Sequence, residues 1–236
     1  MMKEKFQDLI GRLRAAEGEN LVSLVVYGSA VAAPAQAKKS DFQWLVVTRR
    51  LNAEDLRRTR PVIQSLVAGG YSMPVFFTEQ EFQDSLDVFP IEFRQMKRSY
   101  EVLHGRDLLA TSEASSDNLR LQIEYELRGK LLRLRSLYLP ASGTSEGLLK
   151  LMTDSVVSFV RIMRPILELL GEQPPVGRLA AAKQVGERLR IEMSPLIRLL
   201  QLREDPRELM EVETQDLFAA YIACLAEVIE AVDKLN

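Results

Sequence analysis

The sequence predicts an α+β protein whose first half mixes strands with helices and whose second half is all helical. Up to about residue 110, short β-branched apolar runs alternate with stretches of helical periodicity. From Asp117 onward no strand-like run appears, and apolar residues recur every three or four positions. The polar segment LATSEASSDN, residues 109–118, separates the two patterns. We therefore expect an α/β domain over 1–112 and a helical bundle over 113–236.

Four strands are expected in the first half, because each run is apolar and bounded by turn residues. They are LVSLVVYG, FQWLVVT, MPVFFT and, at an edge of the sheet, YEVLHG, which begin at residues 21, 42, 73 and 100.

Helix signals separate these strands. An amphipathic helix precedes Gly18, and another covers 53–68, with Asn52 as its N-cap and Gly69 as its stop. Thr78 is expected to cap a short helix, because Glu81 lies at the capping-box position.

The second half predicts five helices, over about 118–138, 146–170, 176–190, 195–203 and 214–235. Pro165 lies inside the second of them, where a proline removes one backbone hydrogen bond. We therefore expect an interruption or kink at that residue.

Composition excludes several classes of protein. The 236 residues carry 31 basic and 33 acidic side chains, so charge does not indicate a nucleic-acid partner. No apolar run approaches the roughly 18 residues of a membrane span, and the N-terminus reads as a charged amphipathic helix rather than a signal peptide. A cytoplasmic protein without a membrane partner is expected. The single cysteine, Cys224, and single histidine, His104, exclude an internal disulfide and a His–Cys metal cage.

The stretch YGSAVAAPAQAKKSDFQWLVV, residues 27–47, carries the most specific pattern. Gly28 and Ser29 leave an apolar strand, eleven residues intervene, and Asp41 precedes the next apolar run, with Gln43 two positions later. This arrangement resembles the nucleotidyltransferase superfamily, which includes polymerase-β-like and aminoglycoside nucleotidyltransferases. The motif covers roughly 20–80, and the order of elements extends the resemblance loosely over the chain. The resemblance implies a mixed sheet with flanking helices, followed by the helical bundle.

In that family an Asp-x-Asp or Asp-x-Glu pair and a third acid on a later strand hold two Mg²⁺ ions for transfer from a nucleoside triphosphate. Side chains at i and i+2 of a strand share a face, so the pair would lie side by side. Here Gln43 stands in place of the second acid, and 73–78 contain no acid at all. Glu79 and Glu81 follow that strand and suit the start of a helix. One carboxylate of three remains.

The resemblance assigns Asp41 as the catalytic and metal-binding residue, with Mg²⁺ as its ion. It assigns Gly28, Ser29 and Gln43 to nucleotide binding. Lys38 and Lys39 either reach a phosphate or lie on a solvated loop, and Trp44 is expected in the core, opposite Gln43. Cys224 is expected to be a buried thiol.

Three functions follow. The favoured one is a catalytically impaired module that binds a nucleotide or another small molecule and has a regulatory role. The first alternative is an active Mg-dependent enzyme that moves a nucleoside monophosphate from an NTP to an unknown acceptor. The second is a scaffold that forms homo-oligomers through its helical domain and has no small-molecule site. The helix ELRGKLLRLRSLYL, residues 126–139, carries several basic residues. We interpret them as a solvent-exposed face; the alternative is that they contact a polyphosphate.

Overall fold

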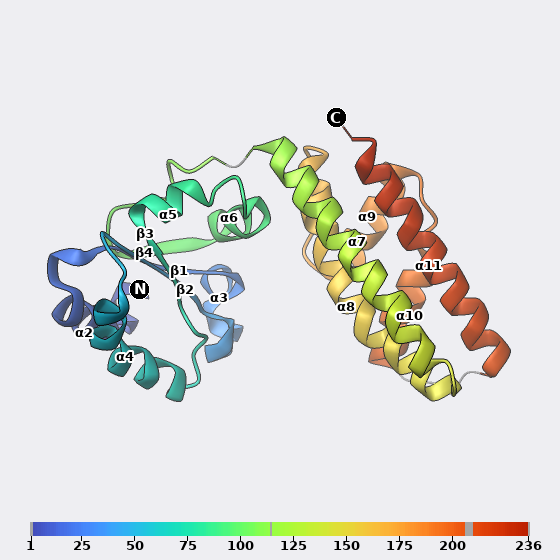
Figure 1. The fold of residues 1–236 in the computed structure, drawn as a ribbon, viewed down its shortest axis with the longest axis horizontal. Coiled ribbons are helices and arrows are strands. Elements are labelled where there is room, and N and C mark those ends of the chain that lie inside the picture. The colour runs from blue at the N-terminus through green and yellow to red at the C-terminus, as the bar shows by residue number, and fades with distance from the viewer. Residues whose placement is uncertain (1, 114, 206–209, 236) are drawn as a thin grey trace. The chain divides into compact units, whose positions relative to one another are not determined.

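The computed structural model describes residues 2–113, 115–205 and 210–235. It divides into two compact units, Met1–Ser115 and Ser116–Asn236. Figure 1 shows the first as a sheet with helices on both sides and the second as helices only. The predicted α+β class is confirmed.

The sheet of the first unit has four strands in the order β3-β2-β1-β4. They are β1 (Leu21–Tyr27), β2 (Gln43–Thr48), β3 (Val75–Thr78) and β4 (Tyr100–Gly105). The strand β1 pairs antiparallel with both β2 and β4, whereas β2 and β3 are parallel, so the sheet is mixed. Every residue of β1 is buried, as its continuous apolar run predicted.

Helices cover both faces of this sheet, and strand residues alternate between the two cores. Leu24, Val26, Trp44 and Val46 pack with α2 and α4 on one face. Val25, Tyr27, Leu45 and Val47 form the other core with residues of α5 and α6. The helices are α1 (Met2–Lys5), α2 (Gln7–Glu17), α3 (Ser29–Ala32), α4 (Ala53–Ala68), α5 (Glu79–Asp84) and α6 (Pro90–Arg98).

The capping signals in the sequence identified two of these helices closely. The Asn52 side chain accepts hydrogen bonds from the N–H groups of Glu54 and Asp55, at 2.9 and 3.0 Å, and α4 ends at Gly69 as predicted. The Thr78–Glu81 capping box opens α5. The sequence reading did not identify α6 as a helix.

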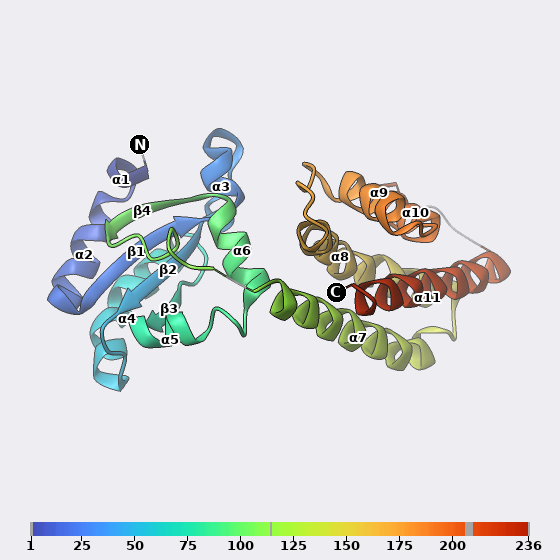
Figure 2. The ribbon, with the colours of Figure 1, turned by 90° about the horizontal axis from the view of Figure 1, so that it is seen from above.

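The second unit contains α7 (Ser116–Ala141), α8 (Ser145–Leu169), α9 (Arg178–Leu189), α10 (Ser194–Glu204) and α11 (Glu211–Asp233). The helix α8 contacts the other four, and α7 lies beside α11 (Figure 2). The expected interruption at Pro165 is wrong, because α8 continues across it, and the kink stays a prediction. Met163, Ile166 and Leu167 around it are fully buried, so packing stabilises the helix despite the missing hydrogen bond.

None of the described helices is both long and apolar enough to cross a membrane.

Candidate functional site

The turn after β1 requires a glycine. Gly28 has φ +99° and ψ −174°, a region of backbone conformation that is essentially restricted to glycine. A Cβ at this position would lie 3.3 Å from the Asp41 carbonyl oxygen and 3.4 Å from Gln43 Cγ. The Gly28 N–H donates to the Ser99 carbonyl at 2.9 Å, and the exposed Ser29 begins the short helix α3. The backbone of Gly28 is therefore held close to the start of β2.

Asp41 does not lie on a strand, although the resemblance to the family's Asp-x-Asp pair implied a strand position. It is the last residue of a 3₁₀ turn, Lys39–Asp41, and β2 begins two residues later. Its carboxylate accepts a hydrogen bond from the Lys38 N–H at 2.8 Å. The i and i+2 argument fails here, because side chains alternate only within a strand. The Asp41 carboxylate thus serves as a local cap of this turn.

Gln43 is the first residue of β2 and pairs with Tyr27, the last residue of β1. It is exposed, and it provides the side chain nearest to Gly28. The structure therefore brings together Gly28, Gln43 and the backbone of Asp41. An amide, with two acceptor sites and two donors, stands where the related enzymes are expected to carry a carboxylate.

A further acid lies near this turn. Tyr27 is buried, and its pKa is raised first by burial and then by the negative charge of Glu92. Glu92 belongs to α6 and so approaches the end of β1 from a helix rather than from a strand. The sequence pattern does not place Glu92, because α6 is too short for a clear helical periodicity.

The two other acids that were considered have structural partners. The Glu81 carboxylate accepts from the Thr78 N–H at 2.7 Å, which completes the capping box of α5. Glu79 forms an ion pair with Arg106. The contact of Glu81 agrees with the expectation that it serves the start of a helix, whereas Glu79, in the first turn of α5, pairs with Arg106.

The residues at the turn do not fit the magnesium site that the fold family implies. Mg²⁺ binds oxygen ligands in octahedral geometry, usually with one or two carboxylates and substrate phosphates. Among the described residues, no three His, Cys, Asp or Glu side chains cluster in a way that could hold a metal. At the turn the candidate oxygen ligands are the Asp41 carboxylate, already engaged with the Lys38 N–H, and the amide oxygen of Gln43, and α6 adds the single acid Glu92. A two-metal cage cannot be built from this set.

Two remaining candidates belong to the cores. Trp44 is 1% exposed, and its ring meets that of Phe6 edge-on at 4.8 Å, so the prediction of core packing is confirmed. Cys224 is buried as expected, and burial raises the pKa of its thiol to about 11.

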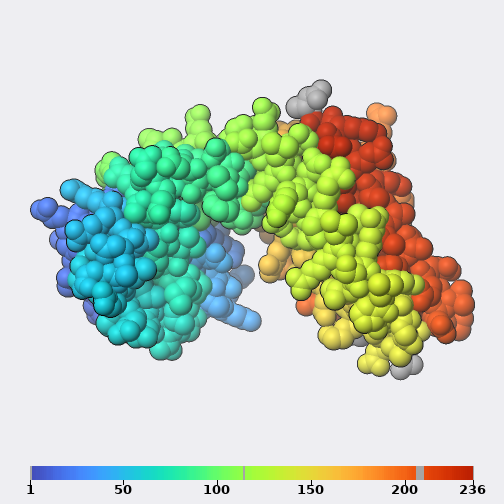
Figure 3. Space-filling view, viewed as in Figure 1, coloured from blue at the N-terminus to red at the C-terminus, as the bar shows by residue number. Residues whose placement is uncertain are grey.

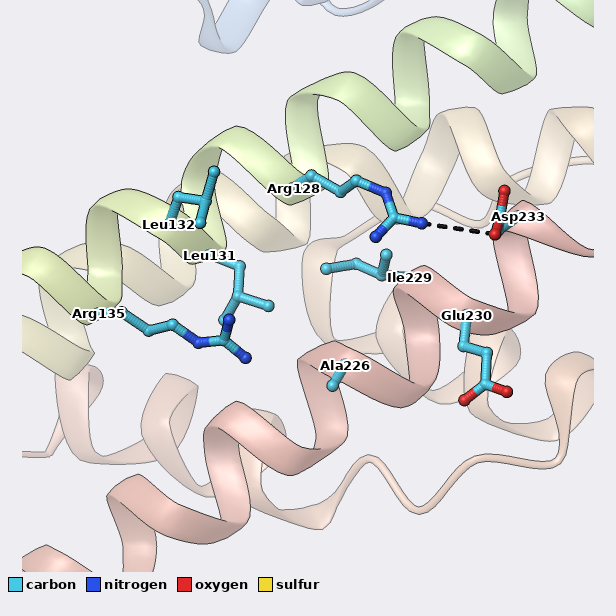
Figure 4. Close-up of a pocket in the computed structure, with 8 residues that line it drawn as sticks. All are labelled: Arg128, Leu131, Leu132, Arg135, Ala226, Ile229, Glu230 and Asp233. Carbon is cyan, nitrogen blue, oxygen red and sulfur yellow. Dashed lines mark hydrogen bonds and ion pairs between the residues drawn. The ribbon is translucent and has the colours of Figure 1, made fainter.

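The basic helix α7 borders a groove in the second unit. This groove has a volume of about 360 Å³ and lies between α7 and α11, with Arg128 and Arg135 extending from α7 (Figure 4). Arg128 pairs with Glu124 at 2.6 Å and with Asp233 at 3.4 Å. Its charge is thus already balanced by acids of the same unit, which supports the reading of a solvated, ion-paired face.

Comparisons with known proteins concern the fold. No protein-family model and no curated protein sequence matches the chain. Among solved structures, the spectinomycin adenyltransferase AAD(9) from Enterococcus faecialis, determined with ATP and spectinomycin, matches with a TM-score of 0.55 at 14% identity. The match covers 97% of this chain and 99% of that one.

A nucleotidyltransferase-like protein from Exiguobacterium sibiricum 255-15 matches with a TM-score of 0.44 at 13% identity, over 98% of this chain and 75% of the other. The match to the adenyltransferase extends over both units of the chain. The chain has the fold of the nucleotidyltransferase superfamily.

Proposed function

We propose that this protein is a nucleotidyltransferase-fold module that binds a nucleotide or another phosphate-bearing small molecule without metal-dependent transfer, and that it acts through this binding. The observation that carries the proposal is the chemistry of the two residues next to Gly28, Asp41 and Gln43. Gln43 supplies an uncharged amide there, and the carboxylate of Asp41 caps the Lys38 N–H. A binding site keeps its backbone and amide donors, whereas two-metal phosphoryl transfer needs clustered carboxylates.

The groups around the turn suit a phosphate. Ser29 is exposed and offers a hydroxyl, and the exposed Gln43 amide has two N–H groups that can donate to a phosphate. Lys38 and Lys39 are exposed on the same connection between β1 and β2. The adenyltransferase with the same fold was determined with ATP, so ATP is the first ligand to test.

The test is thermal unfolding of the full chain with ATP, GTP, CTP or UTP, each with Mg²⁺ or with EDTA. A ligand at about 100 times its Kd stabilises a protein by roughly 2.7 kcal/mol, which shifts Tm by several degrees. We expect a shift with at least one nucleotide that persists in EDTA. Ser29→Glu should abolish it, because a carboxylate repels phosphate. Ser116→Glu, which changes an exposed serine at the start of α7, is the matched control and should retain it.

Substitution of Asp41 distinguishes metal-independent binding from metal-dependent catalysis in the same thermal-unfolding assay. Asp41→Asn removes the charge but keeps an oxygen that can accept from the Lys38 N–H, so the turn should stay folded. The proposal expects unchanged nucleotide binding in this variant. A shift that requires Mg²⁺ and disappears in Asp41→Asn would contradict it. No shift with any nucleotide under either condition would also overturn nucleotide binding at this turn.

The second candidate is an active nucleotidyltransferase that moves a nucleoside monophosphate from an NTP to an unknown acceptor. Its specific support is Glu92, an acid whose charge acts on Tyr27 beside Gly28. Pyrophosphate release from an NTP in the presence of spectinomycin or another aminocyclitol tests it. Release that Glu92→Gln removes would favour the enzyme over the binding module.

A further inference from the structure

A pocket lined by basic side chains, which we call the basic pocket, lies at the end of the sheet where β1 begins. Its volume is about 660 Å³, within the range of small-molecule sites. Three elements bring basic side chains to it: α2 provides Arg14, the residue after β2 is Arg49, and β4 provides His104. Glu19 is the one acid among the described residues that line it. Figure 3 shows the N-terminal segment, in blue, at the surface of the first unit.

The local structure of β4 explains the position of His104. One extra residue of β4, Leu103, stands between the residues that pair with Leu24 and Val25, which makes a bulge. Leu103 packs in the core shared with α2, and the half-buried His104 next to it lines the basic pocket together with residues of that helix. Bulges redirect side chains in this way and are common beside functional sites.

The two arginines of the basic pocket have no partner within the fold. Their neighbours in sequence are paired: Arg12 with Asp8, and Arg50 with Asp55. By contrast, the exposed side chains of Arg14 and Arg49 form no ion pair or hydrogen bond with any residue that the structure describes. Their charges are therefore available to a ligand.

Positive charge also acts on the imidazole of His104. Burial lowers the pKa of His104, and the charges of Arg14 and Lys3 lower it further. The charged residues on the elements around it are Lys3 on α1, Arg14 on α2, Glu19 before β1, Arg49 after β2 and Glu101 on β4, which accepts from the Lys3 backbone N–H at 3.3 Å. A cavity with an excess of one sign of charge concentrates ions of the opposite sign.

We propose that the basic pocket is a second anion site of this protein and that it binds a dianionic phosphate group. A guanidinium can donate two parallel hydrogen bonds to phosphate oxygens, and the imidazole can donate one more. A phosphate ester carries close to two negative charges at pH 7, which two arginines balance. The Gly18 N–H at the end of α2 already donates to the Arg14 carbonyl, so side chains rather than backbone N–H groups hold the phosphate.

This site is separate from the Gly28 turn. The basic pocket includes Leu21, the first residue of β1, whereas Gly28 follows the last residue of that strand. The two positions are about 20 Å apart along the strand. A phosphate in the basic pocket therefore does not occupy the turn.

NMR of the untagged full chain tests the site, because His104 is its only histidine and gives a single set of imidazole signals. These signals are followed from pH 5 to pH 8 in sodium chloride, inorganic phosphate or ribose 5-phosphate at one ionic strength. A bound anion stabilises the imidazolium, so both phosphates should raise the pKa of His104 by on the order of one unit relative to chloride. Tighter binding of ribose 5-phosphate identifies an ester as the ligand, and tighter binding of inorganic phosphate identifies the free ion. The same pKa in all three solutions overturns the proposal.

Substitutions in the basic pocket test which residues bind. Arg14→Gln or Arg49→Gln should weaken phosphate binding at least roughly tenfold, since each removes charge-assisted hydrogen bonds. Glu19→Gln should strengthen binding, because it removes a like charge. Arg57→Gln, which changes an exposed arginine of α4 that pairs with Glu54, is the matched control and should bind as the wild type does. Equal weakening by Arg57→Gln and Arg14→Gln would indicate nonspecific attraction and contradict the site.

Ser29→Glu distinguishes the basic pocket from the proposed nucleotide turn. This variant should leave the response of His104 to phosphate unchanged, because Ser29 lies beyond the opposite end of β1. Loss of the response in Ser29→Glu would place the phosphate at the turn and overturn the second site. If nucleotide binding at the turn fails its own test, the response of His104 still decides the second site independently.

Discussion

Gly28 holds the turn after β1 in a conformation that other residues rarely adopt. This conformation directs the chain into α3 and lets the Gly28 backbone approach Gln43 and Asp41 without a Cβ between them. The candidate site therefore combines the backbone geometry of Gly28 with the amide of Gln43, where the family pattern implies a carboxylate.

At the residue scale, Gly28→Ala should destabilise the protein by about 1–3 kcal/mol, because a Cβ is strained at this backbone angle. Equilibrium unfolding in urea measures the change. Gly11→Ala is the matched control, since Gly11 lies inside α2 with no atom within 4 Å of its added Cβ. It should stabilise by roughly 0.5–1 kcal/mol through helix propensity. An equal effect of both substitutions would show that the Gly28 turn is not strained.

At the scale of elements, buried acids join α2 to α4. Asp55 in α4 accepts from the Asn52 N–H at 3.1 Å and pairs with Arg58. Glu17, at the end of α2, accepts hydrogen bonds from Thr59 and Asn20. The hydrogen bond from Asn52, followed by the charges of Arg58 and Arg50, lowers the pKa of Asp55. This junction fixes the two helices on the same face of the sheet.

The lowered pKa of Asp55 predicts that the stability of the protein depends on pH. Because its folded pKa lies below the unfolded value near 4, the charged carboxylate stabilises the protein above that value. The contribution is lost as pH falls through the folded pKa. Asp55→Asn should therefore show a smaller decrease in Tm than the wild type between pH 6 and pH 3. Asp8→Asn, which changes an 85% exposed acid of α2, is the control and should follow the wild type.

The elements also differ in how well the sequence located them. The predicted bounds of α4 are those observed, because Asn52 and Gly69 mark both ends and the apolar stripe repeats over four turns. The helix α6 has only nine residues and begins at a proline, so its periodicity is too short to separate it from a loop.

At the scale of the whole molecule, the chain has two compact units with separate cores. The only tryptophan, Trp44, is buried in the first unit. Its fluorescence reports unfolding of that unit alone. Circular dichroism at 222 nm reports both units and is dominated by the long helices of the second.

We expect a core substitution to act mainly on the unit that contains it. Leu225→Ala, in α11, should lower the midpoint seen by circular dichroism and leave the Trp44 transition nearly unchanged. Leu24→Ala, in β1, should lower the Trp44 midpoint. Both leucines are fully buried, and such substitutions cost about 2–5 kcal/mol. If either variant shifts both transitions equally, the units unfold as one.

The sequence by itself determined the features that depend on local pattern. Alternating strands and helices, the change to an all-helical second half and the caps of α4 and α5 all follow from neighbouring residues. The resemblance to the nucleotidyltransferase fold also came from the sequence, since Gly28, Ser29 and Asp41 have the family spacing. The absence of an acid at Gln43 was equally visible.

Only the tertiary structure decided where these side chains act. Asp41 ends a 3₁₀ turn and bonds to Lys38, although its spacing to Gln43 suggested a shared strand face. Glu92, whose charge contributes to the raised pKa of Tyr27, lies on a helix that follows the third strand. The exposure of Leu121, Tyr125 and Leu132 on α7 was also decided by tertiary structure, because helical periodicity alone does not tell which apolar residues are packed. Side-chain direction at the end of an element and contact between distant segments depend on packing, and packing is not written in local sequence.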